Sequence, residues 1–246
     1  MRAAIAFAAA MACAVAADAG AQTAEPSAGV KEAVREIVRE YLLEHPEVIE
    51  QAMIALNAKR REEKRARERA ALVENRAALT NHPLSPVSGN PDGEVTLVEF
   101  FDYQCGYCKR SLGPLMELLE SEDGLRVVWK ELPVLCPVSR YAARAAMAAH
   151  RQGRYLDFHV ALMGATGRLS EERAMEIAAQ VGLDVERLRR DMVDPAIEAY
   201  LDETHRLATD LGIKGTPAFV IGDVLVPGAV GRARLKELIA EAANAG

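Results

Sequence analysis

Apolar side chains between residues 30 and 56 recur every three or four positions, which is the spacing of one face of an α-helix. The pair His45-Pro46 divides this stretch, because proline fits the first turn of a helix and disfavours helix in the residue before it. No Gly or Pro follows up to Leu79, so we predict two helices, the second running from about Pro46 to about Leu79. The apolar positions are Val30, Val34, Ile37, Val38, Tyr41 and Leu42 in the first helix, and Val48, Ile49, Ala52, Met53 and Leu56 in the second.

A different pattern begins after the turn-rich segment 82–93. Short apolar runs at 95–101 and 125–132 are typical of buried strands, and a helix-spaced run lies between them. This order predicts a βαβ unit with a parallel pair. Residues 138–211 have helical spacing throughout, and a β-hairpin and a last helix follow. Expected N-caps are Ser139, Ser170, Asp184 and Asp194, the hairpin turn is Gly222-Asp223, and the last helix runs from Arg232 to Ala243.

Residues 1–21 are typical of a secretory signal peptide. Arg2 precedes a run of small and apolar residues, and Ala19-Gly20-Ala21 predicts cleavage near Ala21. A membrane anchor is the alternative, but the run of about 15 residues is shorter than the ~20 that span a bilayer. Lipid attachment at Cys13 is disfavoured, because no Leu-rich lipobox precedes it. The mature protein is therefore expected outside the cytoplasm.

Composition narrows the class of protein. The chain has 246 residues, of which 50% are hydrophobic and 27% charged, which excludes wholesale disorder and a polytopic membrane protein. A net charge of -6 does not indicate a nucleic-acid-binding protein, which would typically be basic. The 4 cysteines are too few for a disulfide scaffold. Removal of the signal peptide takes Cys13 and leaves Cys105, Cys108 and Cys136.

The N-terminal helices form an expected arm at 22–80, beginning with the small, polar tether 22–29. A long helix that is apolar on one side and charged all round later cannot bury itself alone. Its apolar stripes pack either against other copies of the chain or against its own globular domain, and we favour a homo-oligomer. The charged run 59–69 has seven basic and three acidic residues; the interspersed Glu favours a solvated face over a nucleic-acid site.

The sequence Cys105-Gly106-Tyr107-Cys108 follows a predicted strand and opens a helix. Two thiols three positions apart in the first turn can form an accessible disulfide, and the positive end of the helix dipole favours the thiolate of Cys105. Cys105 would then attack, and the more buried Cys108 would resolve the mixed disulfide. A closed zinc site needs four ligands, and only Cys136 and scattered histidines remain, so we expect no metal. An inert structural disulfide is disfavoured, because a disulfide that closes a loop of only two residues stabilises the fold little.

This motif resembles the active site of secreted thioredoxin-fold proteins of the DsbA type. The resemblance covers about 83–246 and rests on the run VEFFDYQCGYC at 98–108, the helical insertion and the run GTPAF at 215–219. The arm additionally resembles the ScsC-like branch, whose members can oligomerise through such an arm. The implied fold is α/β and thioredoxin-like, with an inserted helical subdomain at 138–211 and the helical arm in front.

The resemblance also implies roles for individual residues. Cys105 and Cys108 would be the redox pair. Thr216-Pro217 would form the cis-proline loop, whose Thr216 backbone hydrogen-bonds an extended substrate segment, although Thr-Pro alone would indicate an ordinary trans turn. Glu99 matches a buried acid that assists proton transfer at the inner thiol. Its alternative is a strand residue that faces solvent.

Three further features qualify this expectation. Lys130 is a candidate charge partner for Glu99. The dipeptide Gly106-Tyr107 replaces the Pro-His of DsbA itself, and a neutral Tyr107 cannot stabilise a thiolate as a charged His could. The disulfide is thus expected to be less oxidising, which favours isomerisation or reduction. Cys136 is an extra thiol, either a small buried residue or a regulatory or intermolecular one.

The sequence therefore predicts a periplasmic thiol-disulfide oxidoreductase that acts on cysteine-containing proteins. Disulfide exchange needs no organic cofactor, but recycling requires a partner, expected to be a membrane redox protein. Isomerase or reductase activity is slightly favoured over oxidase activity. The competing class is a non-enzymatic protein on the same fold, either a carrier of a soft metal such as Cu(I) or a surface scaffold.

Overall fold

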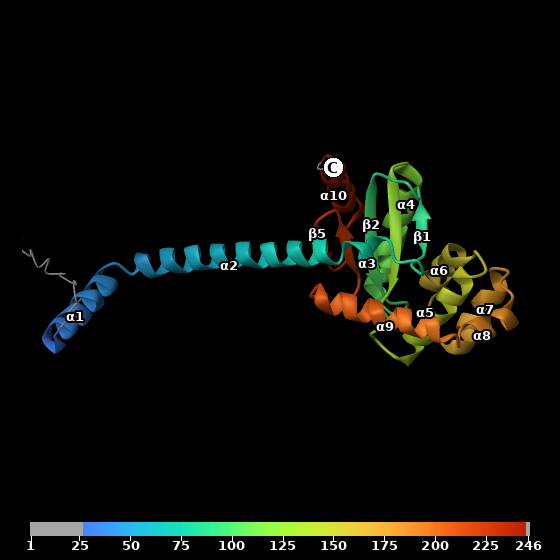
Figure 1. Ribbon diagram of the computed structural model, residues 1–246, viewed down its shortest axis with the longest axis horizontal. Helices are drawn as coiled ribbons and strands as arrows, with labels where there is room; N and C mark the ends of the chain where they lie inside the picture. Colours follow the sequence, from blue (N-terminus) through green and yellow to red (C-terminus); the bar gives the residue numbers. More distant parts are fainter. Residues whose placement is uncertain (1–26, 245–246) are drawn as a thin grey trace, which may run out of the picture. The chain divides into compact units, whose positions relative to one another are not determined.

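The computed structural model describes residues 27–244 (Figure 1). The predicted signal peptide and Cys13 lie outside these residues. The chain falls into two compact units, one up to Ala58 and one from Lys59 onward. Residues 59–80, which we assigned to the arm, group with the second unit.

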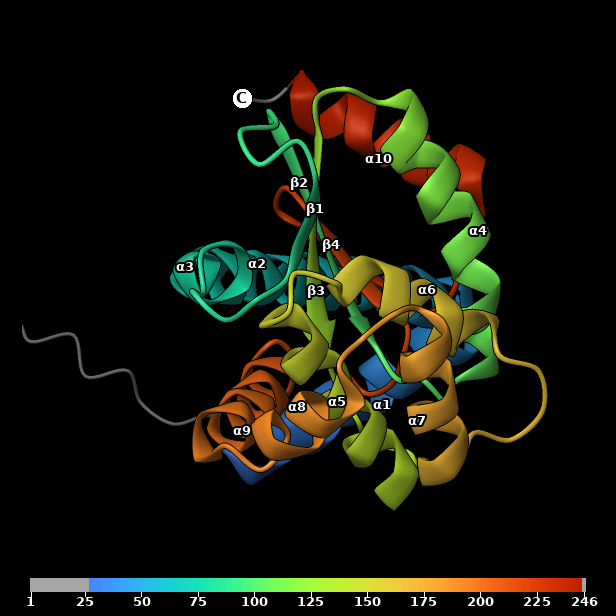
Figure 2. The same cartoon turned by 90° about the vertical axis from the view of Figure 1, so that its right-hand side faces the viewer.

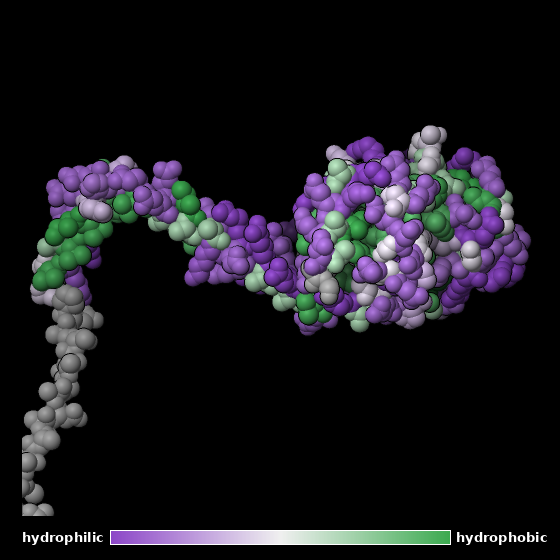
Figure 3. All heavy atoms as spheres, turned by 90° about the horizontal axis from the view of Figure 1, so that it is seen from above, coloured by the Kyte–Doolittle hydropathy of each residue, from purple (hydrophilic) through white to green (hydrophobic). Residues whose placement is uncertain are grey.

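The first unit consists of helix α1, Ala28–Glu44, and the first part of α2, Glu47–Glu74. Helix α1 ends at His45, whose backbone N–H donates to the Tyr41 carbonyl, and α2 starts directly after Pro46, as expected. None of the α1 side chains is buried. Figure 3 shows hydrophobic residues gathered on this helix. The large exposed apolar side chains of this unit are Val30, Val34, Ile37, Val38, Tyr41, Leu43, Ile49, Met53, Ile54 and Leu56.

Our prediction of one helix from Pro46 to Leu79 is wrong at its C-terminal end. Helix α2 stops at Glu74, and a separate helix α3 covers Arg76–Thr80. Asn75 between them has φ -95° and ψ 10°, and its side-chain amide donates to the Ala71 carbonyl at 2.9 Å. Asparagine competes for backbone hydrogen bonds in this way and so interrupts helices. The break lets both Leu72 and Leu79 reach the core, where they are 3% and 2% exposed.

A 5-stranded sheet with the order β1-β3-β2-β4-β5 forms the centre of the second unit. Strands β2 and β3 are parallel, as the βαβ pattern predicts, and the other neighbours are antiparallel. The predicted hairpin joins β4 to β5, and Gly222 in its turn has a φ of 56°. Strand β1 lies in the segment 82–93, which we predicted to contain turns only. It was not predicted because three residues are too few to show the alternation of a strand. The strands are β1 Val87–Gly89, β2 Val95–Phe101, β3 Leu125–Glu131, β4 Ala218–Ile221 and β5 Val224–Pro227.

Helices cover both faces of the sheet (Figure 2). Helices α4, Gly106–Ser121, and α10, Arg232–Ala243, pack on one face, and α3, α9 and the end of α2 pack on the other. Alternate residues of each strand point to opposite faces, so β2 and β3 are buried on both sides. The α4 face receives Leu97, Phe101, Val127 and Trp129, and the α9 face receives Val98, Phe100, Val128 and Val220.

The predicted helical insertion contains five helices between β3 and β4. The expected N-caps Ser170, Asp184 and Asp194 are all observed, and each side chain accepts a backbone N–H. The expected cap Ser139 is wrong. Pro137 already occupies the first turn, so Cys136 is the cap residue instead. The five helices are α5 Pro137–His150, α6 Tyr155–Gly164, α7 Glu171–Gln180, α8 Val185–Asp191 and α9 Pro195–Asp210.

A buried polar cluster joins this insertion to the sheet. The Glu131 carboxyl, at the end of β3, accepts hydrogen bonds from the hydroxyls of Tyr103 and Tyr155, both at 2.9 Å. The Tyr103 hydroxyl is also 3.1 Å from Nδ1 of His159 on α6. Burial raises the pKa of Glu131 well above its usual range and lowers that of His159 to about 3. Glu131 and His159 are therefore neutral in the core, and their burial does not carry the free-energy cost of desolvating a charge.

Candidate active site

Cys105 is the N-cap residue of α4, at the end of the short loop that leaves β2. Its Sγ accepts from the backbone N–H of Cys108 at 3.4 Å and donates to the Thr216 carbonyl at 3.2 Å. The side chain is 7% exposed, and both cysteines are free thiols. Unpaired N–H groups at a helix N-terminus stabilise negative charge, so this position suits a reactive sulfur.

Cys108 lies one turn further into α4 and is only 1% exposed. Burial is the largest cause that raises the pKa of this thiol well above its usual range. The two thiols of the motif are thus unequal: the outer one is the more exposed of the two, and the inner one is protected and holds its proton. This inequality is what sequential exchange requires, because one sulfur meets the substrate and the other reacts only afterwards.

The Thr216–Pro217 peptide bond is cis, and it brings residues from the far end of the chain against the motif. Pro217 is buried and Thr216 is partly exposed. The Pro217 carbonyl accepts from the Gly228 N–H at 2.8 Å, which ties the loop to the end of β5. Thr216 is thus held in place beside Cys105 while part of it stays open to solvent.

Glu99 lies in the middle of β2, where its side chain is 2% exposed. The alternative of a strand residue facing solvent is therefore excluded. Burial raises the pKa of this carboxyl to about 8, and the nearby Cys105 raises it further in the same direction. An acid with a pKa near neutrality can both hold and release a proton at working pH.

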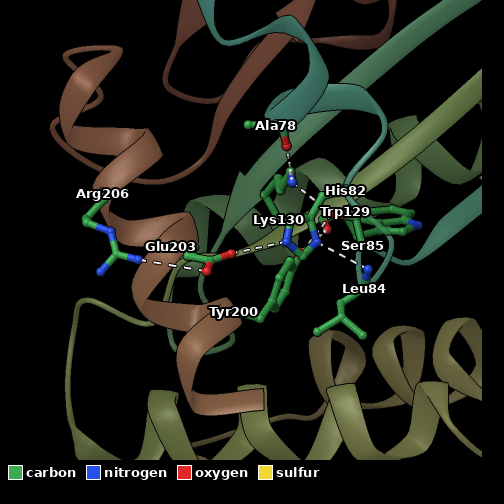
Figure 4. A network of polar contacts seen from close by, with 9 residues as sticks. All are labelled: Ala78, His82, Leu84, Ser85, Trp129, Lys130, Tyr200, Glu203 and Arg206. Carbon is green, nitrogen blue, oxygen red and sulfur yellow. Dashed lines mark hydrogen bonds and ion pairs between the residues drawn. The ribbon is translucent and has the colours of Figure 1, made fainter. Parts of the chain in front are cut away.

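Lys130 is not the charge partner of Glu99, and this prediction is wrong. In the β2–β3 register Glu99 is paired with Trp129, whereas Lys130 is paired with Phe100, so the two charged side chains point to opposite faces. Figure 4 shows where Lys130 goes instead. Its Nζ donates to the Ala78 carbonyl and to Ser85 Oγ, both at 2.7 Å. Burial lowers the pKa of this amine to about 8.

Asp102 is a residue of the site that our sequence reasoning missed. Its Oδ1 accepts from the Gln104 N–H and the Ser139 hydroxyl at 2.8 and 2.7 Å, and its Oδ2 accepts from the N–H groups of Val134 and Leu135 at 2.9 and 3.0 Å. The Asp102 side chain, which is 1% exposed, thus holds three segments together: the loop before Cys105, the loop after β3 and the start of α5. An acid directly after a buried strand is the signal that could have marked it.

The dipeptide between the cysteines is open to solvent. Tyr107 is 59% exposed, and the Arg110 guanidinium lies 4.3 Å from the centre of its ring. Exposed Val134 and Leu135, on the loop held by Asp102, add further apolar surface.

Cys136 is partly exposed, so the first of our two alternatives, a small buried residue, is wrong. Its Sγ lies 3.5 Å from the Ser139 hydroxyl, and this hydrogen bond is the main cause that lowers the pKa of the thiol. No disulfide joins Cys136 to either of the other thiols of residues 27–244.

Two features are absent from residues 27–244. No group of three or more His, Cys, Asp and Glu side chains in this range is arranged to hold a metal ion. No helix there is long and apolar enough to cross a membrane.

A CxxC pair at a helix N-terminus, opposite a cis-proline loop and next to a central sheet with helices on both faces, defines the thioredoxin-like fold that we expected. Residues 96–240, more than half of the chain, match the family described as DSBA-like thioredoxin domain. The chain belongs to this family. Residues 31–63 match the family described as copper resistance protein ScsC N-terminal domain, in agreement with the resemblance of the arm.

Solved structures support this assignment. A thioredoxin-like oxidoreductase from Silicibacter pomeroyi DSS-3 is 46% identical, with a TM-score of 0.68 over 70% of this chain and 99% of that chain. ScsC from Proteus mirabilis in a transitional conformation is 30% identical, with a TM-score of 0.67 over 90% of this chain and 100% of that chain. The match to ScsC thus includes the N-terminal helices.

Curated relatives share one part of the chain. A Na(+)/H(+) antiporter NhaA 1 from Salinispora arenicola is 31% identical over 137 residues, which are 55% of this chain and 21% of the relative. The chain therefore spans about a fifth of the length of the curated relatives it matches.

Proposed function

We propose that the protein is a thiol-disulfide oxidoreductase that exchanges disulfides with cysteine-containing proteins through Cys105 and Cys108. The observation that carries this proposal is the position of the Cys105 sulfur, 3.4 Å from the Cys108 N–H and 3.2 Å from the Thr216 carbonyl. It is held at a helix N-terminus, next to a backbone that an extended substrate segment can pair with, and one turn from a second, protected thiol. Family membership supports this chemistry.

Disulfide exchange has two steps, and the second step differs between reduction and isomerisation. The Cys105 thiolate attacks one sulfur of a substrate disulfide, which forms a mixed disulfide and releases the other substrate sulfur as a thiolate. In reduction, Cys108 then loses its proton and attacks Cys105, which releases the second substrate thiol and leaves a Cys105–Cys108 disulfide. In isomerisation, a different substrate thiolate attacks the mixed disulfide and returns Cys105 to the thiolate. Oxidation of a substrate is the reduction sequence run backwards.

Glu99 serves the inner thiol in this proposal. Cys108 must lose a proton before it can attack, yet its burial makes ionisation costly. The equally buried Glu99 carboxyl, with a pKa of about 8, can take that proton in its ionised form. The same group returns the proton when Cys108 is released as a leaving group.

Isomerase or reductase activity is the form we favour, because Gly106-Tyr107 supplies no charged group to stabilise the reduced state. We expect the reduced protein to reshuffle a scrambled, disulfide-bonded substrate into its native form in a refolding assay. The reduction potential of the cysteine pair is expected to lie below the about −120 mV of DsbA. Fast oxidation of a reduced substrate without any reshuffling would show that the protein is an oxidase instead.

The cellular setting is part of the proposal. Residues 1–21 act as a signal peptide that directs the protein to the periplasm, and a membrane redox protein returns the cysteine pair to its working state. A solved relative that is 30% identical is described as a periplasmic thioredoxin-like protein from Salmonella enterica serovar Typhimurium.

We assign the three parts of the chain as signal peptide 1–21, oligomerisation arm 22–80 and catalytic domain 83–246, with the helical insert at 138–211. The exposed stripe of α1 supports the role of the arm. Val34 and Ile37 are 52% and 65% exposed, and apolar surface of this extent favours burial against further copies of the same helix. An oligomer would also hold several active sites around one substrate, which suits isomerisation.

The double variant Val34→Asp/Ile37→Asp is expected to convert an oligomer of the mature protein into a monomer, because the new charges cannot be buried in an apolar interface. Light scattering gives the mass of both forms. Gln51→Asp is the matched control, since it adds a charge to an exposed position of α2 away from the apolar stripe. Equal masses for the wild type and the double variant would refute the role of the arm.

A further inference from the structure

The surface next to the cysteine motif carries a positive charge that has no acidic partner. Arg110 lies one turn after Gly106 on α4, and its guanidinium folds back over the Tyr107 ring, 4.3 Å from the ring centre. Its Nη1 is 3.7 Å from the position that a Cβ on Gly106 would occupy, so this charge lies directly beside the motif. Arg110 is exposed and forms no ion pair with any residue in the range 27–244.

A second positive charge comes from the loop between α6 and α7, which passes the start of α4 (Figure 2). Two hydrogen bonds hold this loop against the motif. The Lys109 Nζ donates to the Ala165 carbonyl at 2.7 Å. The Gln104 side-chain amide donates to the Leu169 carbonyl at 2.9 Å. Arg168, between these two anchors, is exposed and has no ion-pair partner in the described part of the chain.

A third positive charge lies on the segment that leads into the cis-proline loop. Lys214 is exposed and precedes Thr216 by two residues, and the Thr216 carbonyl accepts from the Cys105 sulfur. Asp210 lines the same stretch of surface as Lys214 and offsets its charge in part. Three separate segments of the chain thus bring a cation towards the reactive sulfur, and the two arginines are the ones without a nearby acid.

The acids around the motif do not neutralise this surface. Glu99 is buried, and with a pKa of about 8 it holds its proton at neutral pH. Asp102 is buried and accepts four hydrogen bonds. Glu171 and Glu172 lie in the first turn of α7, where the positive end of that helix attracts them. The surface at the motif is therefore positive, although the whole chain has a net charge of -6.

We propose that this positive surface selects disulfide substrates in which acidic residues flank the reacting cysteine. The inference rests on the proposed exchange activity and names its substrate class. Carboxylates of such a substrate would meet the Arg110 and Arg168 guanidinium groups, whose planar shape suits bidentate pairing with a carboxylate. Attraction between unlike charges speeds the encounter of two molecules and is weakened by salt. Substrates with basic flanking residues are repelled by the same groups.

The test uses one disulfide-bonded peptide in three forms, with Glu, Gln or Lys on both sides of the cysteine. The reduced mature protein is mixed with each peptide, and the second-order rate constant of a single turnover is measured. Measurements at about 10 mM and about 1 M NaCl compare conditions in which charges act over about 30 Å and about 3 Å. The rate constants of the same peptides with dithiothreitol, an uncharged dithiol, correct for differences in the reactivity of their disulfides.

Three variants locate the effect. Arg110→Gln/Arg168→Gln removes the two unpaired charges beside the motif, and Lys214→Gln removes the charge before the cis-proline loop. Arg61→Gln/Arg65→Gln is the matched control, because it changes the net charge as the first variant does. It removes two exposed arginines of α2 that also have no ion pair within residues 27–244 but lie outside the surface at the motif.

At low salt, the wild type and the control variant are expected to react at least about tenfold faster with the Glu peptide than with the Lys peptide, with the Gln peptide between them. This ratio should approach one at high salt. Arg110→Gln/Arg168→Gln should lower it at least about threefold at low salt, and Lys214→Gln should lower it in the same direction.

A ratio that is independent of salt, or that survives in Arg110→Gln/Arg168→Gln, overturns the inference. An equal loss of rate on all three peptides also overturns it, because it would show a general defect in exchange rather than selection by charge. The same fall in Arg61→Gln/Arg65→Gln would show that total charge selects the substrate, which is a further refutation. If the wild type reacts with none of the peptides, the proposed function fails first.

Discussion

Cys105→Ser is expected to abolish disulfide exchange, and Cys108→Ser is expected to stop the reaction halfway. A serine hydroxyl cannot form the mixed disulfide, so loss of the outer sulfur should lower the exchange rate at least about a thousandfold. Without the inner sulfur, Cys105 still attacks a substrate disulfide, but nothing in the motif resolves the product. The variant should therefore accumulate a covalent complex with its substrate.

Mass spectrometry after mixing with an unfolded, disulfide-containing protein detects this complex, and a turbidity or fluorescence assay gives the rate. Cys136→Ser is the matched control, because it removes a partly exposed thiol outside the motif and should keep the wild-type rate. Exchange by the Cys105→Ser variant would contradict the proposed mechanism. If the protein were a surface scaffold, neither Cys105→Ser nor Cys108→Ser would change its function. If it were a Cu(I) carrier, both variants would lose metal binding and neither would form a mixed disulfide.

Glu99→Gln is expected to stabilise the fold at alkaline pH and to slow the reaction. The Glu99 carboxyl has a pKa of about 8 in the folded protein, against 4.5 ordinarily. Between these two values the folded state keeps a proton that the unfolded state has released, so stability falls as pH rises through this window and levels off above pH 8. At about 1.4 kcal/mol per pH unit, the free energy of unfolding lost by pH 8 is on the order of 4 kcal/mol, and a neutral amide avoids it.

Urea unfolding at pH 5 and pH 8.5 measures this effect. The wild type should be less stable at pH 8.5 by a few kcal/mol relative to the variant, and the two should converge near pH 5. Glu94→Gln, which changes an exposed acid in front of the same strand, should follow the wild type. Resolution of the mixed disulfide by Cys108 should be slower in Glu99→Gln, because the amide cannot accept its proton. If the wild type and Glu99→Gln differed in free energy of unfolding by the same amount at both pH values, Glu99 would be ionised in the folded protein.

Local patterns were sufficient to predict most of the fold. The parallel pair β2–β3, the final hairpin and the last helix follow from apolar runs and turn residues, which act within a few positions of the chain. Ser170, Asp184 and Asp194 were recognised as caps because a side-chain oxygen at the start of a helix satisfies a free backbone N–H. The cysteine motif was equally visible, since its chemistry depends on residue type and spacing.

The wrong cap at Ser139 had a local cause, Pro137, but the other errors concern interactions between distant segments. Asn75 interrupts the helix locally, but the packing of Leu72 and Leu79 against the sheet, which favours a break between them, is not visible in any local pattern. The wrong partner for Lys130 came from ignoring strand register, since a shift of one residue moves a side chain to the other face. Asp102 was missed because three of its four partners lie more than thirty positions away along the chain.

The cluster around Glu131 makes the helical insertion inseparable from the rest of the domain. A designer who trimmed α6 to obtain a smaller catalyst would remove Tyr155 and His159 together. The Glu131 carboxyl and the Tyr103 hydroxyl would then face either bulk water in an opened core or a cavity without partners. Tyr103 is two residues before Cys105, so the damage would reach the reactive sulfur. Removal of α6 from this scaffold therefore has to be combined with replacement of both Glu131 and Tyr103 by apolar residues.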